Sequence, residues 1–248
     1  MLCHEASPFF LSSWSPMTES VGEGAEQRQG KRRKWLLAVD PGAPFSDEAV
    51  QVFQDWSCGV AATGLEAEME WLAIDAHRRF TGSREQPLFC AFLTVFAASG
   101  FDPARLGSPD GMQVTIFGLS AQPVFDRIGP EPRGATPGIK KTTLWRARAD
   151  LETATWQARY REHASLVPRV HASAWRYCQN VIEEAPAGLS FQAVSELWWP
   201  TDEDLLERFY ASEEARRLVA EDTRGFIDIP SAIQTVTRHE RLARGALA

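Results

Sequence analysis

The stretch "YREHASLVPRVHASAWRYCQN", residues 160–180, gathers two histidines, two tyrosines and two side-chain amides. His163 is the side chain in it best suited to proton transfer, because imidazole titrates near neutral pH. On a helix with about 100° per residue, Tyr160 and His163 both lie within about 40° of Trp156. The spacing therefore places His163 on the core-facing stripe of a helix, one turn from Tyr160.

Two interpretations of His163 follow. It is a general acid/base, with Tyr160 and Tyr177 as further catalytic candidates that hold a substrate oxygen, or it is a buried histidine that hydrogen-bonds a backbone carbonyl or Tyr160. His171 follows eight residues later, across Pro168, which is not the i, i+4 spacing of a helical zinc motif. The sequence therefore predicts no metal site.

Aromatic side chains are dense after residue 142, where they either build a core or line a pocket for a flat ligand. In the strand expected over residues 173–181, Tyr177 shares a face with Trp175, and Asn180 lies on the opposite face. The sequence does not tell which face meets the helices. The substrate-binding candidates are Trp156, Trp175, Asn180, Trp198 and Phe226. Glu196 and Asp222 are candidate supporting carboxylates, although solvation is the default for both.

The elements that must position these residues repeat along the chain. The first half begins with the strand "KWLLAVDPG", then a helix capped by Ser46, a helical stretch over residues 65–80, and two strands, "LFCAFLTVF" and "MQVTIFGLSA". After a Pro- and Gly-rich segment, the second half shows strand, helix, strand, strand, a helix capped by Thr201, and a last strand. This order, β-α-β-β-α-β, is that of a ferredoxin-like unit.

The two halves also align at low identity. "FQDWSCGV" (53–60) overlays "YREHASLV" (160–167), so Trp56 stands where the second half has His163. A ferredoxin-like unit covers one face of its sheet with helices and leaves the other face in need of a partner. We therefore expect an α+β fold in which two ferredoxin-like units form an intrachain barrel.

Four motifs in the second half resemble the EthD family of the dimeric α+β barrel superfamily. They are "REHASL" (161–166), "RYCQN" (176–180), "ELWW" (196–199) and "AED" through "GFID" (220–228). The first half lacks them, so it resembles a degenerate copy. The resemblance implies a site in the second half that uses His163, and chemistry on aromatic or polyketide-type molecules without a metal or organic cofactor.

The expected domain organisation is a disordered segment at 1–33, a degenerate ferredoxin-like half at 34–126, a linker at 127–141 and an EthD-like half at 142–241. Net charge is -7, so nucleic acid is not an expected partner. No apolar stretch approaches a membrane span, and the N-terminus lacks the features of a signal peptide. Four dispersed cysteines favour reduced thiols in the cytoplasm. Translation starts at Met1 or Met17.

Glycine-rich phosphate loops, nucleophile elbows and dinucleotide fingerprints are absent from the sequence, which excludes the corresponding enzyme classes. The preferred function is a cofactor-independent lyase, dehydratase or isomerase acting on an aromatic or other hydrophobic small molecule. Two alternatives stay open: a non-catalytic protein that binds a hydrophobic metabolite, and a cofactor-free oxygenase. The sequence also leaves open whether two chains pair as a homodimer.

Overall fold

The computed structural model describes residues 32–127 and 134–242, with side chains from residue 138 onward in the second range. Most of the segment expected to be disordered, and the choice between Met1 and Met17, lie outside these residues. Arg32 and Arg33 belong to the first strand. Among the described residues, no helix is long and apolar enough to cross a bilayer.

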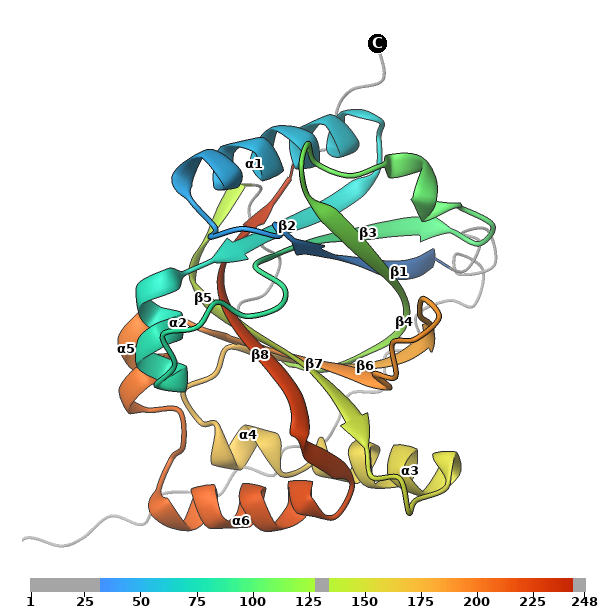
Figure 1. Ribbon diagram of the computed structural model, residues 1–248. Helices are drawn as coiled ribbons and strands as arrows, with labels where there is room; N and C mark the ends of the chain where they lie inside the picture. The colour runs from blue at the N-terminus through green and yellow to red at the C-terminus, as the bar shows by residue number, and fades with distance from the viewer. Residues whose placement is uncertain (1–31, 128–133, 243–248) are drawn as a thin grey trace, which may run out of the picture. The chain divides into compact units, whose positions relative to one another are not determined.

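The described residues form eight strands and six α-helices (Figure 1). The strands are β1 (Arg32–Asp40), β2 (Glu66–Leu72), β3 (Ala91–Ala98), β4 (Gln113–Asp126), β5 (Gly134–Ala147), β6 (Arg176–Glu184), β7 (Ala193–Trp199) and β8 (Ile227–Arg241). The helices are α1 (Asp47–Ala62), α2 (Ile74–Thr81), α3 (Thr153–His163), α4 (Val167–Val170), α5 (Asp202–Glu207) and α6 (Glu213–Arg224). A 3-10 turn spans Pro103–Leu106.

The strands close into a barrel in the order β1-β3-β2-β8-β5-β7-β6-β4, with antiparallel pairing throughout the described ladder. Closure leaves no free sheet edge in this ladder. The first four strands neighbour one another as β4-β1-β3-β2, and the last four as β8-β5-β7-β6. The two sets join where β2 pairs with β8 and β4 pairs with β6. The mixed α/β class with an antiparallel barrel is as the sequence predicted.

Helices cover the barrel on two opposite sides. Figure 1 shows α1 on one side and α3, α4 and α6 on the other. Alternate strand residues therefore face either a helix or the barrel interior. In β1, Trp35, Leu37 and Val39 pack with the α1 residue Phe53, whereas Leu36 belongs to the interior cluster.

Residues 65–80 correct the sequence interpretation, because they form β2 and then α2 instead of one helix. In β2, Ala67 and Met69 pack in the cluster that includes α1, while Glu70 points into the barrel and contacts Lys140 at 2.5 Å. Acidic and apolar residues alternate along β2, so the strand places its carboxylates on one face and its apolar side chains on the other. The lysine partner lies 70 residues away, so the sequence did not reveal why this face could be acidic.

The linker expected at 127–141 is also corrected. β4 runs to Asp126, and β5 already includes residues 134–141, so only a short connection separates them. Residues 128–133 lie outside the described residues. Gly138 explains part of the misinterpretation: its φ of +109° favours glycine, and a Cβ there would lie 2.2 Å from the carbonyl oxygen of Trp199.

The ends of two helices shape the site. α3 ends at His163, and Pro168 lies in the first turn of α4, where its missing N–H costs nothing. Thr201 caps α5 as predicted, by accepting a hydrogen bond from the Asp204 backbone N–H at 3.1 Å. However, α5 ends at Glu207, so the aromatic residues that follow it lie in a connecting segment.

Candidate active site

A cavity of about 830 Å³ lies between the second-half sheet and the helices α4, α5 and α6. Residues of β5, β6, β7 and β8 line it from the sheet side, and α2 contributes from the first half. Its aromatic lining consists of Phe80, Trp145, Tyr177, Phe209 and Tyr210. Mixed aromatic and polar lining at this volume suits a hydrophobic small molecule that carries a few polar groups.

His163 lines this cavity from the end of α3. Its Nδ1 lies 2.6 Å from Oδ2 of Asp222 on α6, and the imidazole is about 10% exposed. A carboxylate accepts hydrogen bonds only, so Nδ1–H donates to Asp222. Nε2 of the neutral ring is then left as an acceptor, and no described residue hydrogen-bonds to it. This geometry is that of a histidine base oriented by a carboxylate.

His171 is a second imidazole on the cavity wall. Its Nδ1 lies 2.6 Å from the carbonyl oxygen of Phe209, to which it donates. Its ring also packs against Phe209 and Tyr210, at centroid distances of 4.5 and 5.2 Å. Burial lowers the pKa of His171 to about 4, so the ring is neutral at pH 7 with Nε2 unprotonated.

Tyr177 lines the cavity, whereas Tyr160 lies behind it. The Tyr160 hydroxyl donates to the Val194 carbonyl at 3.2 Å and lies 2.9 Å from Oγ of Ser195, which accepts from Nε1 of Trp145 at 3.1 Å. The Tyr177 hydroxyl accepts from Nε2 of Gln179 at 3.2 Å. Burial raises the pKa of Tyr160 and of Tyr177 well above that of a free tyrosine. Both hydroxyls therefore stay protonated and can donate a hydrogen bond but not serve as a base at neutral pH.

Lys141 is a cavity residue that the sequence interpretation missed. It lies on β5 next to Lys140, but the two side chains face opposite sides of the sheet. Burial lowers the pKa of Lys141 to about 8. Lys140 and Lys141 stood at the end of the segment expected as a linker, and only the register of β5 shows that the Lys141 amine lines the cavity.

The remaining aromatic candidates flank the cavity at different depths. Phe226 packs 5.7 Å from the His163 ring and 5.6 Å from Trp145. Trp156 packs on Trp145 from behind, at 5.8 Å. Trp175 is half-buried just before β6, where its backbone N–H donates to the Trp198 carbonyl at 2.7 Å. Phe226 and Trp156 therefore pack behind residues of the cavity wall, and none of the three rings is among the lining residues.

Asn180 and Trp198 do not reach the cavity, because both side chains point into the barrel. Nδ2 of Asn180 donates to Glu196 at 2.8 Å and to the Val194 carbonyl at 2.9 Å. The Trp198 ring packs under the Lys140 ammonium at 4.4 Å. The expectation that Asn180 and Trp198 bind substrate beside His163 is therefore corrected, because both side chains lie on the face of the sheet opposite to the cavity. Glu196, expected as a supporting carboxylate, also lies inside the barrel.

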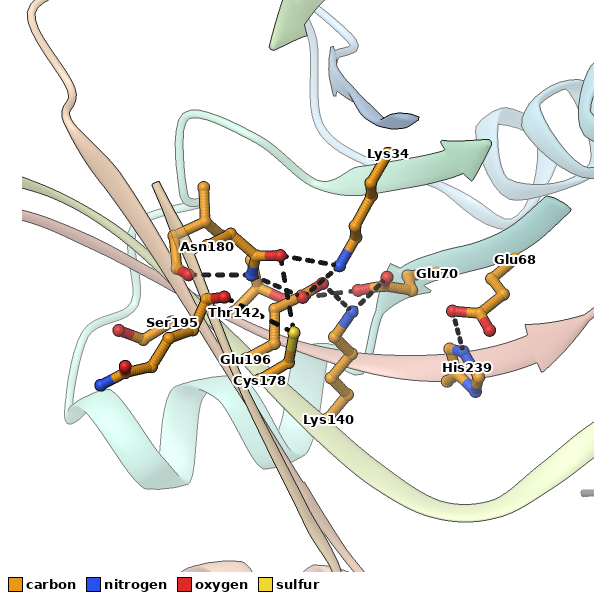
Figure 2. Close-up of polar contacts among 12 residues, drawn as sticks. Lys34, Glu68, Glu70, Lys140, Thr142, Cys178, Asn180, Ser195, Glu196 and His239 are labelled. Carbon is orange, nitrogen blue, oxygen red and sulfur yellow. Dashed lines mark hydrogen bonds and ion pairs between the residues drawn. The ribbon is translucent and has the colours of Figure 1, made fainter. Parts of the chain in front are cut away.

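The barrel interior holds a buried ionic network that joins the two halves (Figure 2). Lys140 contacts Glu70 at 2.5 Å and Glu196 at 2.6 Å, and Lys34 also contacts Glu196. Burial alone would raise the pKa of Glu196, but Lys140 and Lys34 hold it well below its usual range. Burial alone would lower the pKa of each lysine, and the carboxylates raise both. Two ammonium groups and two carboxylates thus neutralise one another across the barrel.

Trp56, the counterpart of His163 in the first half, has a packing role. Its ring lies 6.1 Å from Phe53, and its Nε1 donates to the Leu106 carbonyl at 3.1 Å. Among the described residues, no group of three or more His, Cys, Asp or Glu side chains is arranged to hold a metal ion. The expectation of a site without metal or organic cofactor stays a prediction.

No family model matches the chain, and no curated protein matches its sequence. Among solved structures, an anthrone oxidase-like protein aligns with a TM-score of 0.56 at 10% identity, over 87% of this chain and 96% of that chain. A monooxygenase-like protein from Lactobacillus acidophilus NCFM aligns with a TM-score of 0.48 at 8% identity, over 87% and 97%. At 10% identity, the alignment with the anthrone oxidase-like protein shows a shared fold and not a shared function.

Proposed function

We propose that this protein is a cofactor-independent enzyme that moves a proton on an aromatic or other hydrophobic small molecule, as a lyase, dehydratase or isomerase. The observation that carries the proposal is His163, which lines the cavity with Nδ1 bound to Asp222 at 2.6 Å. A positioned imidazole accelerates proton transfer by about 10²–10⁴-fold. The carboxylate fixes the tautomer that leaves Nε2 free to accept the proton.

The chain is, in this proposal, a fused pair of ferredoxin-like halves of which only the second is catalytic. The strand orders β4-β1-β3-β2 and β8-β5-β7-β6 support the repeat. The three EthD-like motifs that contain His163, Tyr177 and Asp222 converge on the cavity, which supports a relation to that family. Trp56 packs in the first-half core where the second half presents His163, which supports a degenerate first half.

A mass-spectrometric assay tests the function for any net reaction that begins with removal of a proton from carbon. Aromatic and polyketide-type carbonyl compounds are incubated with the protein in D₂O, and consumption and deuterium uptake at carbon are both recorded. The proposal expects uptake or turnover with the wild type and its loss in His163→Gln, with an unchanged circular dichroism spectrum. Wild-type rates in a folded His163→Gln variant would contradict the role of His163.

The same assay separates the two alternatives. A protein that only binds a hydrophobic metabolite would retain a compound without consumption or deuterium uptake, in the wild type and the variant alike. A cofactor-free oxygenase would consume oxygen in proportion to product. Pairing of chains into a homodimer and a cytoplasmic location stay predictions.

A further inference from the structure

Lys140 and Lys141 provide an internal comparison of two buried lysines on one strand. Each of Lys34 and Lys140, inside the barrel, has a carboxylate partner. Lys141 faces the cavity and is 9% exposed, and no carboxylate lies within ion-pair distance of it among the residues that the structure describes. A buried ammonium without a counter-ion is costly, because little in its surroundings replaces its hydration.

The contacts that Lys141 does make are weak for a charged group. Its Nζ donates to Oγ1 of Thr143 at 3.1 Å. It also lies 5.3 Å from the ring centre of Phe209 and 5.6 Å from that of Phe80, within cation–π range. An ammonium has three N–H donors, and one hydroxyl and two ring faces do not supply a negative charge.

The other titratable groups on the cavity wall do not neutralise Lys141. Glu207 and Glu213 line the cavity but are exposed, and Glu213 lies 3.7 Å from Arg216. The remaining titratable groups on the cavity wall are Arg79, His163, His171, Tyr177 and Tyr210. With His171 neutral and the tyrosines protonated, the buried part of the cavity carries an uncompensated positive charge at Lys141.

We propose that Lys141 binds an anionic oxygen of the substrate, so that the ligand class is an aromatic carboxylate, phenolate or enolisable carbonyl compound. The inference rests on the proposed function in taking the same cavity as the ligand site. When His163 accepts a proton from the carbon beside a carbonyl group, the C–H electron pair forms the enolate, and its negative oxygen lies against the Lys141 ammonium. Aromatic rings around the amine would accept the flat part of the ligand.

A pair of unreactive probes tests the charge preference apart from catalysis. We would measure binding of 2-naphthoate and of its neutral analogue 2-naphthamide at pH 7 by quenching of tryptophan fluorescence. The wild type is expected to bind naphthoate at least about tenfold more tightly than the amide. Lys141→Met should remove this preference while it retains naphthamide, and Arg79→Met, which removes an exposed cation of the same cavity, should keep it.

The proposal is overturned if the wild type binds the two probes equally, binds neither, or if Lys141→Met keeps the preference for naphthoate. Circular dichroism of each variant excludes unfolding as the cause of a loss. The probes undergo no proton transfer, so this result is independent of the deuterium-uptake assay. A failed charge preference with intact His163-dependent uptake would refute the role of Lys141 alone.

Discussion

Replacing Lys141 with methionine should stabilise the protein, because it removes a desolvated charge and keeps the side-chain length. Burial lowers the pKa of this lysine from 10.5 to about 8. At about 1.36 kcal/mol for each pKa unit, the protonated form costs about 3 kcal/mol in the folded state. Loss of the hydrogen bond to Thr143 offsets about 1 kcal/mol of the gain. The free energy of unfolding at pH 7 should therefore rise by about 2 kcal/mol, or about 4–8 °C in Tm.

The pH dependence of this effect has a defined sign. Below pH 8 the lysine is protonated in both folded and unfolded states, so the folded state bears the full cost. Between pH 8 and 10.5 the unfolded lysine holds a proton that the folded one has lost, so the cost falls as pH rises. Between pH 7 and pH 9 the stability difference between Lys141→Met and wild type should shrink by about 1 kcal/mol.

Urea denaturation followed by tryptophan fluorescence at pH 7 and pH 9 measures this difference directly. Subtracting the two proteins at each pH cancels the titration of groups that they share. A Lys141→Met variant that is less stable than wild type at pH 7, or a stability difference that does not shrink at pH 9, would refute the reasoning. Lys141 would then be compensated in the folded state, and its cavity would need no anionic ligand.

Two further perturbations test how the barrel is held together. Glu196→Gln leaves Lys140 and Lys34 inside the barrel with one fewer charge partner, and should cost about 3–5 kcal/mol at pH 7, measured by urea denaturation. Since the folded pKa of Glu196 is lowered, its stabilisation is present above about pH 4.5 and is lost below it. The variant should therefore lose less stability on acidification, and an equal acid loss in both proteins would contradict this. Gly138→Ala should lower Tm much more than Gly188→Ala, because both glycines have positive φ but only Gly138 has a carbonyl oxygen where the Cβ would lie. Equal shifts would show that backbone strain, and not the clash, dominates.

Local sequence patterns predicted a structural feature correctly where the residues that determine it are close together in the sequence. The Ser46 and Thr201 caps, the strand at Arg176–Glu184 and the inward stripe of α3 follow from spacing and capping chemistry, and the structure has them. The placement of His163 on a buried helix face is of this kind. Its neighbour Asp222 lies 59 residues further on, and in the sequence only the resemblance to known motifs relates the two.

Distant partners account for what the sequence did not show. The burial of Glu70 and Glu196 inside the barrel could not be predicted, because a buried glutamate needs a cationic partner and their partner Lys140 lies far away in the sequence. Asn180 and Trp198 were grouped with His163 because a strand's period of two does not say which face meets the helices. Lys141 was overlooked for the same reason, since its neighbour Lys140 has the opposite environment.

Deuterium uptake by Asp222→Asn, compared with Glu221→Gln, tests most directly whether the His163–Asp222 pair moves a proton. Glu221 is an exposed carboxylate next to Asp222 on the same helix, so its replacement controls for loss of one negative charge. The account predicts that Asp222→Asn slows His163-dependent uptake at least about tenfold, because an amide in place of the carboxylate no longer holds the imidazole in the tautomer that leaves Nε2 as the base, while Glu221→Gln retains the wild-type rate. Wild-type uptake in a folded Asp222→Asn variant would contradict the central claim.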